Sequence, residues 1–137
     1  LRYYRFGPTD AGYDAAATVL QTQAFSGIGL RPYAVAHLKA GRDAAGAVAL
    51  NWVRRTRQEG DSWESVEVPL AEASEAYGLR LTSGANTFRE VTVSAPEWSY
   101  TPAMQAADGM SGPVTIAVAQ LSQRYGAGPF RSVTVTL

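Results

Sequence analysis

The chain of 137 residues has no cysteine, one histidine and one lysine. Without cysteine it has neither a disulfide framework nor a thiolate metal site. No apolar run approaches the roughly 18 residues that a membrane-spanning helix needs, so we expect no membrane span. The formal net charge is zero, which gives no general attraction to nucleic acid, and no nucleic-acid partner is expected.

The motifs that carry most enzyme chemistry are also missing. His37, the only histidine, has no GxSxG elbow and no HExxH pair to work with. Its spacing from Val35 places both on one side of a predicted strand, which favours a structural or surface role. Five acidic residues are more simply a solvated face than a paired-carboxylate active site: Asp61, Glu64, Glu67, Glu72 and Glu75. We therefore predict that the protein is not an enzyme and needs no cofactor and no metal.

The first residues do not read as a targeting segment. The chain starts at Leu1 and lacks the charged start, long apolar run and cleavage site of a signal peptide. The first six residues already resemble a folded strand. We expect the chain to be a piece of a longer protein.

The stretch 46–57, GAVALNWVRRTR, organises the rest of the sequence. Val48, Leu50 and Trp52 alternate with small or polar residues, which is the period of an antiparallel strand with one face in a core. Trp52 is the largest residue on that face. The predicted core around it contains Tyr77, Leu79, Ile116, Val118 and Val135.

Alternating apolar residues predict further strands along the chain. They lie at 1–6, 32–40, 63–70, 77–81, 88–94, 98–101, 114–122 and 132–137, with a corner or helical turn at 103–108. Residues 9–31 have no clean period, and 15–20 favour at most one or two helical turns. About seven strands within ~105 residues predict an antiparallel β-sandwich over 31–137. Residues 1–30 are interpreted as a linker or arm from a preceding domain.

The last third of the chain resembles a fibronectin type III domain. The run 114–122, VTIAVAQLS, is followed by the glycine loop GAGP (126–129) and then by SVTV (132–135). The position of Trp52 on an early strand and of Tyr77 on a middle strand fits the same pattern. Val114 departs from it, because such domains usually have tyrosine there, and 57–77 is longer than usual. The resemblance implies a fibronectin type III-like sandwich.

A second resemblance covers nearly the whole chain. Its blocks are RYYRFGP (2–8), GLRPYAVAHLKAGRD (29–43), ALNWVRRTR (49–57), DSWESVEVPLAEASEAY (61–77), REV (89–91) and VAQLSQRYGAGP (118–129). Together they are similar to the C-terminal end of the baseplate megatron protein of gene transfer agents and related siphophages, whose TIM-barrel-like domain lies upstream. The resemblance implies a structural module of a tail tip within the virion. Its partners would be other tail and baseplate subunits, in a homo-oligomeric hub.

Arg54, Arg55 and Arg57 follow Trp52 directly, and two interpretations of them stay open. They can form a cross-strand charge ladder with the acidic residues at 59, 61, 64 and 67, which we favour. They can also form a docking surface, since arginine stacks on aromatic rings while it binds carboxylates. The candidate contact residues are Arg55, Arg57, Trp63 and Tyr125.

A carbohydrate-binding module is the alternative function. It would hold the tip on host cell-surface polysaccharide through exposed aromatic rings. The candidates are Trp63 or Trp98 with Tyr125 or Phe130.

Overall fold

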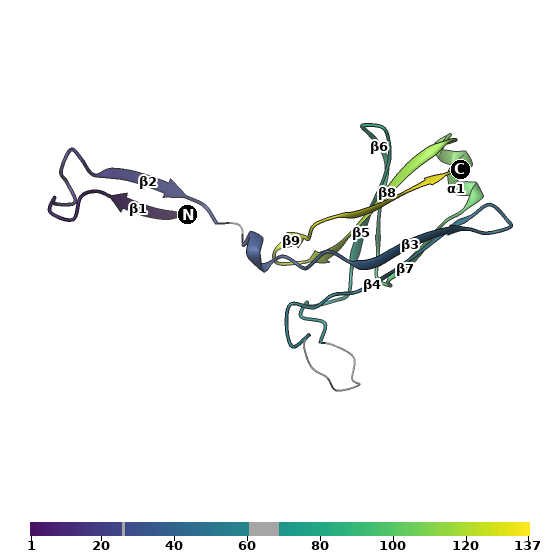
Figure 1. Ribbon diagram of the computed structural model, residues 1–137, viewed down its shortest axis with the longest axis horizontal. Helices are drawn as coiled ribbons and strands as arrows, with labels where there is room; N and C mark the ends of the chain where they lie inside the picture. The colour runs from purple at the N-terminus through teal and green to yellow at the C-terminus, as the bar shows by residue number, and fades with distance from the viewer. Residues whose placement is uncertain (26, 61–68) are drawn as a thin grey trace.

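Two antiparallel sheets pack over one core in the second part of the chain, and a separate two-stranded hairpin precedes them (Figure 1). The computed structural model describes residues 1–25, 27–60 and 69–137. One sheet has the order β3–β4–β7, and the other has β10–β8–β5–β6 with the short β9 paired to β8. The predicted all-β sandwich is confirmed.

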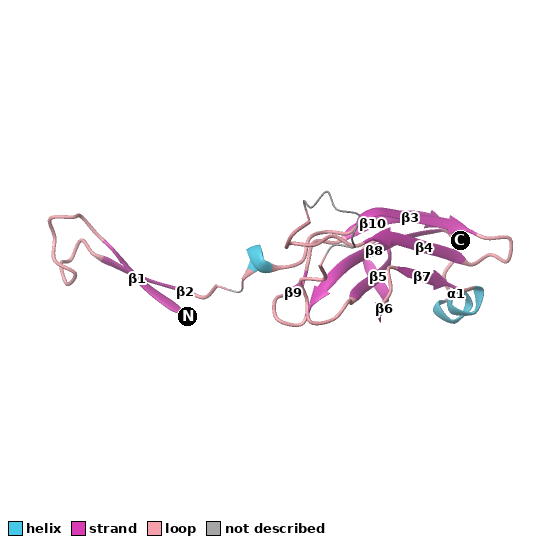
Figure 2. Ribbon diagram, turned by 90° about the horizontal axis from the view of Figure 1, so that it is seen from below, coloured by secondary structure: helices cyan, strands magenta, loops and turns pink. Residues whose placement is uncertain are grey.

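The bounds of most sandwich strands lie close to the predicted ones, but β3 begins at Ala36 rather than at 32, and β9 lies in a segment predicted as a loop. The first sheet contains β3 (Ala36–Arg42), β4 (Val48–Val53) and β7 (Glu97–Tyr100). The second contains β5 (Tyr77–Ser83), β6 (Asn86–Val93), β8 (Pro113–Ser122), β9 (Gly126–Ala127) and β10 (Arg131–Thr136). Figure 2 shows β3 and β10 next to each other.

Trp52 lies in the core, as its place on β4 predicts. Residues along β4 alternate strictly between buried and exposed, and the Trp52 side chain is only 4% exposed. Its indole meets the Tyr77 ring edge to face, with centroids 5.1 Å apart, across the space between the sheets. The predicted neighbours Leu79, Ile116 and Val118 are buried, while Val135 is half-buried and packs against the same cluster.

A β-bulge in β3 corrects the prediction that His37 lies on the same side as Val35. The pairing of β3 with β4 shifts register between Ala36 and Lys39, and His37 has φ 50°. The extra residue turns the following side chains to the other face, because the bulge breaks the period of two. Val35 is therefore buried, whereas His37 is exposed.

The predicted corner at 103–108 is a short helix, α1 (Pro102–Asp108). Thr101 caps its first turn by accepting a hydrogen bond from the Met104 N–H, and Gly109 ends it in a left-handed conformation with φ 63°. At its last residue, Asp108 accepts two hydrogen bonds of 2.6 Å from Arg89 and one of 2.7 Å from the Tyr100 hydroxyl. This cluster ties the helix to β6 and β7.

The first 25 residues contain a strand pair where an irregular arm was expected. The predicted strand at 1–6 is confirmed as β1 (Arg2–Phe6), but β2 (Val19–Gln23) replaces the helical turn expected at 15–20, which was wrong. The two strands pair antiparallel, with Arg2 opposite Gln23 and Phe6 opposite Val19. The hairpin stands away from the sandwich, and the chain reaches the sandwich through the 3-10 turn η1 (Ile28–Leu30) (Figure 1).

Most of the strand predicted at 63–70 lies outside the described residues, and so does Trp63. The last two residues of that prediction, Pro69 and Leu70, are described and are not in a strand. The segment 71–76 is irregular, as expected for a connection.

Candidate functional site: the arginine–tyrosine junction

Three of the four candidate contact residues lie where the arm reaches the sandwich. At this end the chain after β4, the segment after η1 and the loop after β8 form three adjoining hollows. We call this region the junction and define it by Arg31, Tyr33, Arg55, Arg57, Arg124 and Tyr125. Trp63, the fourth candidate, lies outside the described residues.

Gln120 fixes the backbone of Arg55. The Arg55 N–H donates to the Gln120 Oε1 at 2.8 Å, and the Gln120 Nε2 donates to the Arg55 carbonyl at 2.9 Å. The amide side chain thus pairs with the chain beyond β4 as a neighbouring strand would, and it links the two sheets. Gln120 is buried, so both hydrogen bonds satisfy groups that water does not reach freely.

Gln120 and its role were missed in the sequence, although a signal was present. The apolar period of Val114, Ile116 and Val118 continues to Gln120 and Ser122, which places two polar side chains on the core face. A polar side chain on such a face needs a hydrogen-bond partner, so this pattern indicates a structural amide.

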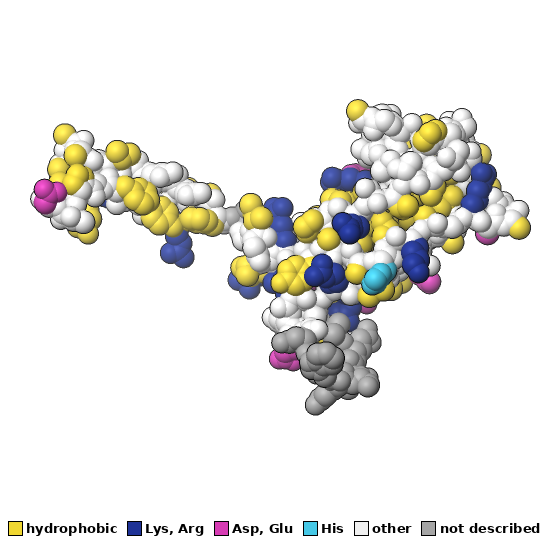
Figure 3. Space-filling view, in the orientation of Figure 1, with side chains coloured by type: hydrophobic (Ala, Val, Ile, Leu, Met, Phe, Trp, Pro, Cys, Tyr) yellow, Lys and Arg dark blue, Asp and Glu magenta, His cyan; other side chains and the backbone are white. Residues whose placement is uncertain are grey.

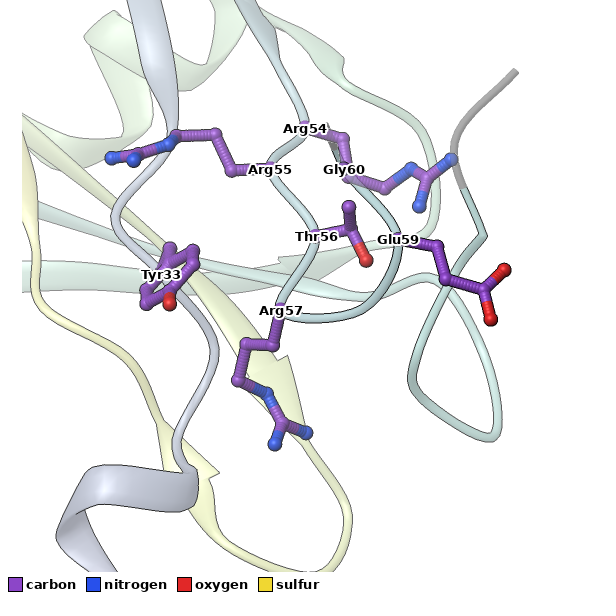
Figure 4. A pocket seen from close by; sticks show the side chains of 7 residues that line it. All are labelled: Tyr33, Arg54, Arg55, Thr56, Arg57, Glu59 and Gly60. Carbon is purple, nitrogen blue, oxygen red and sulfur yellow. The ribbon is translucent and has the colours of Figure 1, made fainter. Parts of the chain in front are cut away.

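Arg55 points to the side of the chain where Tyr33 lies, whereas Arg54 and Glu59 point to the other side (Figure 4). The Arg55 guanidinium lies over the Tyr33 ring, with Cζ 5.1 Å from the centroid. Tyr33 precedes β3, and its ring is 47% exposed. This stack holds a charged group at the wall of a hollow of about 550 Å³.

Two guanidinium groups lie over the Tyr125 ring. Arg57 lies 5.7 Å from its centroid and Arg124 lies 5.3 Å from it. Arg57 also forms an ion pair with Glu72, and both side chains are largely shielded from solvent, at 16% and 10% exposed. The charge of Arg57 is thereby neutralised within the protein.

Backbone contacts set the position of Tyr125. The Ser122 hydroxyl accepts hydrogen bonds from the Arg124 and Tyr125 N–H groups, which folds the turn after β8. Gly27 has φ 65°, and a Cβ at this position would lie 2.9 Å from the Tyr125 ring. The arm therefore rests against this ring where a larger residue would not fit.

The favoured charge ladder is largely untested, because most of its acidic positions lie outside the described residues. Arg57 pairs with Glu72, from the connection before β5, rather than with an acidic residue of the predicted hairpin. Arg54 donates to the Pro69 carbonyl at 2.9 Å. The acidic positions 61, 64 and 67 lie outside the described residues.

The described aromatic residues proposed for sugar binding each contact other side chains rather than one another. Trp98 stacks on Tyr100 with ring centroids 5.8 Å apart and is half-buried. Phe130 lies beneath Arg80, whose Cζ is 4.6 Å from the ring centroid. Tyr125 belongs to the junction, and among the described residues no ring contact joins these three side chains.

Within the described ranges 1–25, 27–60 and 69–137, no three histidine, aspartate or glutamate side chains lie close enough together to hold a metal ion. No helix there is long and apolar enough to cross a membrane.

Comparisons with known proteins give information on the fold. No protein-family model matches the chain, and no curated protein matches it significantly. Among solved structures, the extracellular region of rat CD45, domains d3–d4, is similar with a TM-score of 0.56 and 13% identity. The likeness covers 99% of this chain and 64% of that one. The fold is fibronectin type III-like. At this identity, the likeness concerns the fold alone.

Proposed function

We propose that the chain is a structural module at the C-terminal end of a phage-like tail-tip hub protein, of the kind found in gene transfer agents. It acts in tail assembly within the virion, and its partners are other tail and baseplate subunits around a homo-oligomeric hub. The hairpin β1–β2, with its exposed apolar side chains, is the observation that carries the proposal.

Both faces of the hairpin leave apolar side chains in solvent. Paired strand residues share a face, so Phe6 and Val19 lie together, and Phe25 continues the same side of β2. Their side chains are 57%, 63% and 61% exposed. Figure 3 shows hydrophobic side chains following the hairpin along most of its length.

A lone two-stranded hairpin is marginal in water, because it buries little apolar surface and leaves both strand edges unpaired. Tyr4 gives this hairpin a small aromatic cluster of its own, stacking on Phe6 at 5.9 Å and meeting Phe25 at 6.1 Å. The cluster leaves Phe6 and Phe25 largely exposed, while Tyr4 is half-buried. A neighbouring subunit that covers this face would stabilise the hairpin, which supports an assembly role.

Replacing the hairpin's aromatic face tests the proposal. We expect Phe6→Ser with Phe25→Ser to prevent incorporation of the protein into particles, while the thermal unfolding of the sandwich stays unchanged. Val53→Ser is the control, because Val53 is 51% exposed on the sandwich itself. Normal incorporation of the double variant would contradict the proposal.

Incubation of the purified chain with peptidoglycan and capsular polysaccharide tests the rival functions. We expect neither retention nor new reducing ends. Retention without cleavage would favour the carbohydrate-binding alternative. Cleavage that is lost on replacing His37 or a single carboxylate would identify an enzyme.

A further inference from the structure

We propose that the junction binds an acidic segment of a neighbouring protein subunit, whose carboxylates are held by Arg55 and Arg124. The inference depends on the proposed function only for the source of that segment. The recognition chemistry follows from charge and geometry at the junction.

Among the described residues that line the three hollows, arginine side chains outnumber carboxylates. Arg57 is paired with Glu72, but within the described part of the chain no carboxylate forms an ion pair with Arg55 or Arg124. Arg31 adds a third guanidinium, in the wall of the hollow beside Tyr33 and Arg55. A ligand that carries carboxylates supplies the negative charge and the acceptors that these groups lack.

Both arginines are held in place for such a ligand. Arg55 lies on Tyr33 and is anchored through its backbone by Gln120, while Arg124 lies on Tyr125 in the turn folded by Ser122. A guanidinium held on an aromatic face keeps its N–H donors at the rim, where they can bind a carboxylate. Less side-chain entropy is then lost on binding.

Arg55 and Arg124 lie beside two hollows that share a wall residue. The hollow beside Arg55 and Tyr33 and the one beside Arg124 and Tyr125 both have Arg57 in their walls. Each has a volume of about 550 Å³. An extended chain lying along them would meet Arg55 and Arg124 in turn.

An acidic protein segment fits this surface better than a polysaccharide. The guanidinium groups occupy faces of both tyrosine rings, which sugar rings would need for stacking. A third hollow, of about 470 Å³, shares Arg55 and Tyr33 with the first and has apolar walls from Ile28, Pro32 and Pro129. A peptide can place an apolar side chain there beside its carboxylates, whereas a polyuronate has none to place.

The test uses fluorescein-labelled peptides and the purified chain. An alternating Glu–Leu octapeptide is titrated by fluorescence anisotropy, with a Lys–Leu octapeptide and labelled polygalacturonate for comparison. We expect binding of the Glu–Leu peptide alone, weakened at about 0.5 M NaCl by screening. Arg55→Gln with Arg124→Gln should weaken binding about tenfold or more.

A charge-matched variant is the control for that loss. Lys39→Gln with Arg42→Gln removes two exposed positive charges from β3 and should bind like wild type. Thermal unfolding of both double variants verifies folding. Absence of peptide binding, equal binding by the Arg55 and Arg124 variant, or preference for polygalacturonate would overturn the inference. Peptide binding by a chain that never enters tail particles would overturn only the proposed function.

Discussion

At the scale of single residues, Trp52 is a core contact between the two sheets. Its indole is buried and meets the Tyr77 ring from the opposite sheet. Trp52→Ala removes this contact and leaves a cavity, so we expect the free energy of unfolding to fall by about 3–5 kcal/mol, enough to prevent stable folding of the domain. Urea unfolding followed by circular dichroism measures the change. Near wild-type stability would show that the core is centred elsewhere.

Gln120 is a buried polar residue that, like Trp52, links the two sheets. Gln120→Ala removes both hydrogen bonds to the Arg55 backbone. We expect a loss of about 1–3 kcal/mol and faster hydrogen exchange at the Arg55 amide. Gln123→Ala is the control, because Gln123 is an exposed glutamine three residues along the chain. Unchanged exchange at Arg55 would contradict the role given to this amide.

At the scale of elements, one carboxylate connects helix α1 to both sheets. Two hydrogen bonds from Arg89 lower the pKa of Asp108, helped by the Tyr100 hydroxyl and opposed by burial. Burial, together with the hydrogen bond to Asp108, raises the pKa of Tyr100. The folded-state pKa of Asp108 therefore lies below its value of about 3.9 in an unfolded chain.

The lowered pKa of Asp108 predicts how the free energy of unfolding changes at acid pH. A carboxyl group with a lowered folded-state pKa contributes its full stability above the unfolded value and loses it as the pH falls through the folded one. We expect Asp108→Asn to lower the unfolding free energy at neutral pH and to flatten its decline below about pH 4. Urea unfolding across the acid range measures both, with the exposed Asp10→Asn as control. An unchanged acid slope would exclude Asp108 as its source.

Sequence periodicity predicted the core-facing sides of β4, β5 and β8, because these strands keep a strict alternation over their core faces. It failed at His37, where a bulge with positive φ inserts one residue without a marker in the apolar pattern. It also missed β2, because all residues of this strand are exposed and no alternation of buried apolar side chains marks it. The pairing of Arg57 with Glu72 depends on the path of the connection before β5, which local sequence does not determine.

At the scale of the whole molecule, the hairpin buries much less apolar surface than the sandwich does. Residues 1–25 contribute no member to the buried core. We expect proteinase K to cut the isolated chain between Gly7 and Gly29 before it cuts after Pro32, because local unfolding of the hairpin costs least. Mass spectrometry of early fragments locates the cuts. Earlier cleavage within the sandwich would show that residues 1–30 are the more stable part.

We propose that the hairpin and the junction are assembly surfaces of a tail tip. A density map of the intact particle that carries this chain would show what lies against both surfaces. We expect neighbouring subunits to cover the aromatic face of β1–β2 and to contact Arg55 and Arg124 with acidic side chains. A map in which the hairpin face and the junction are both open to solvent would contradict it.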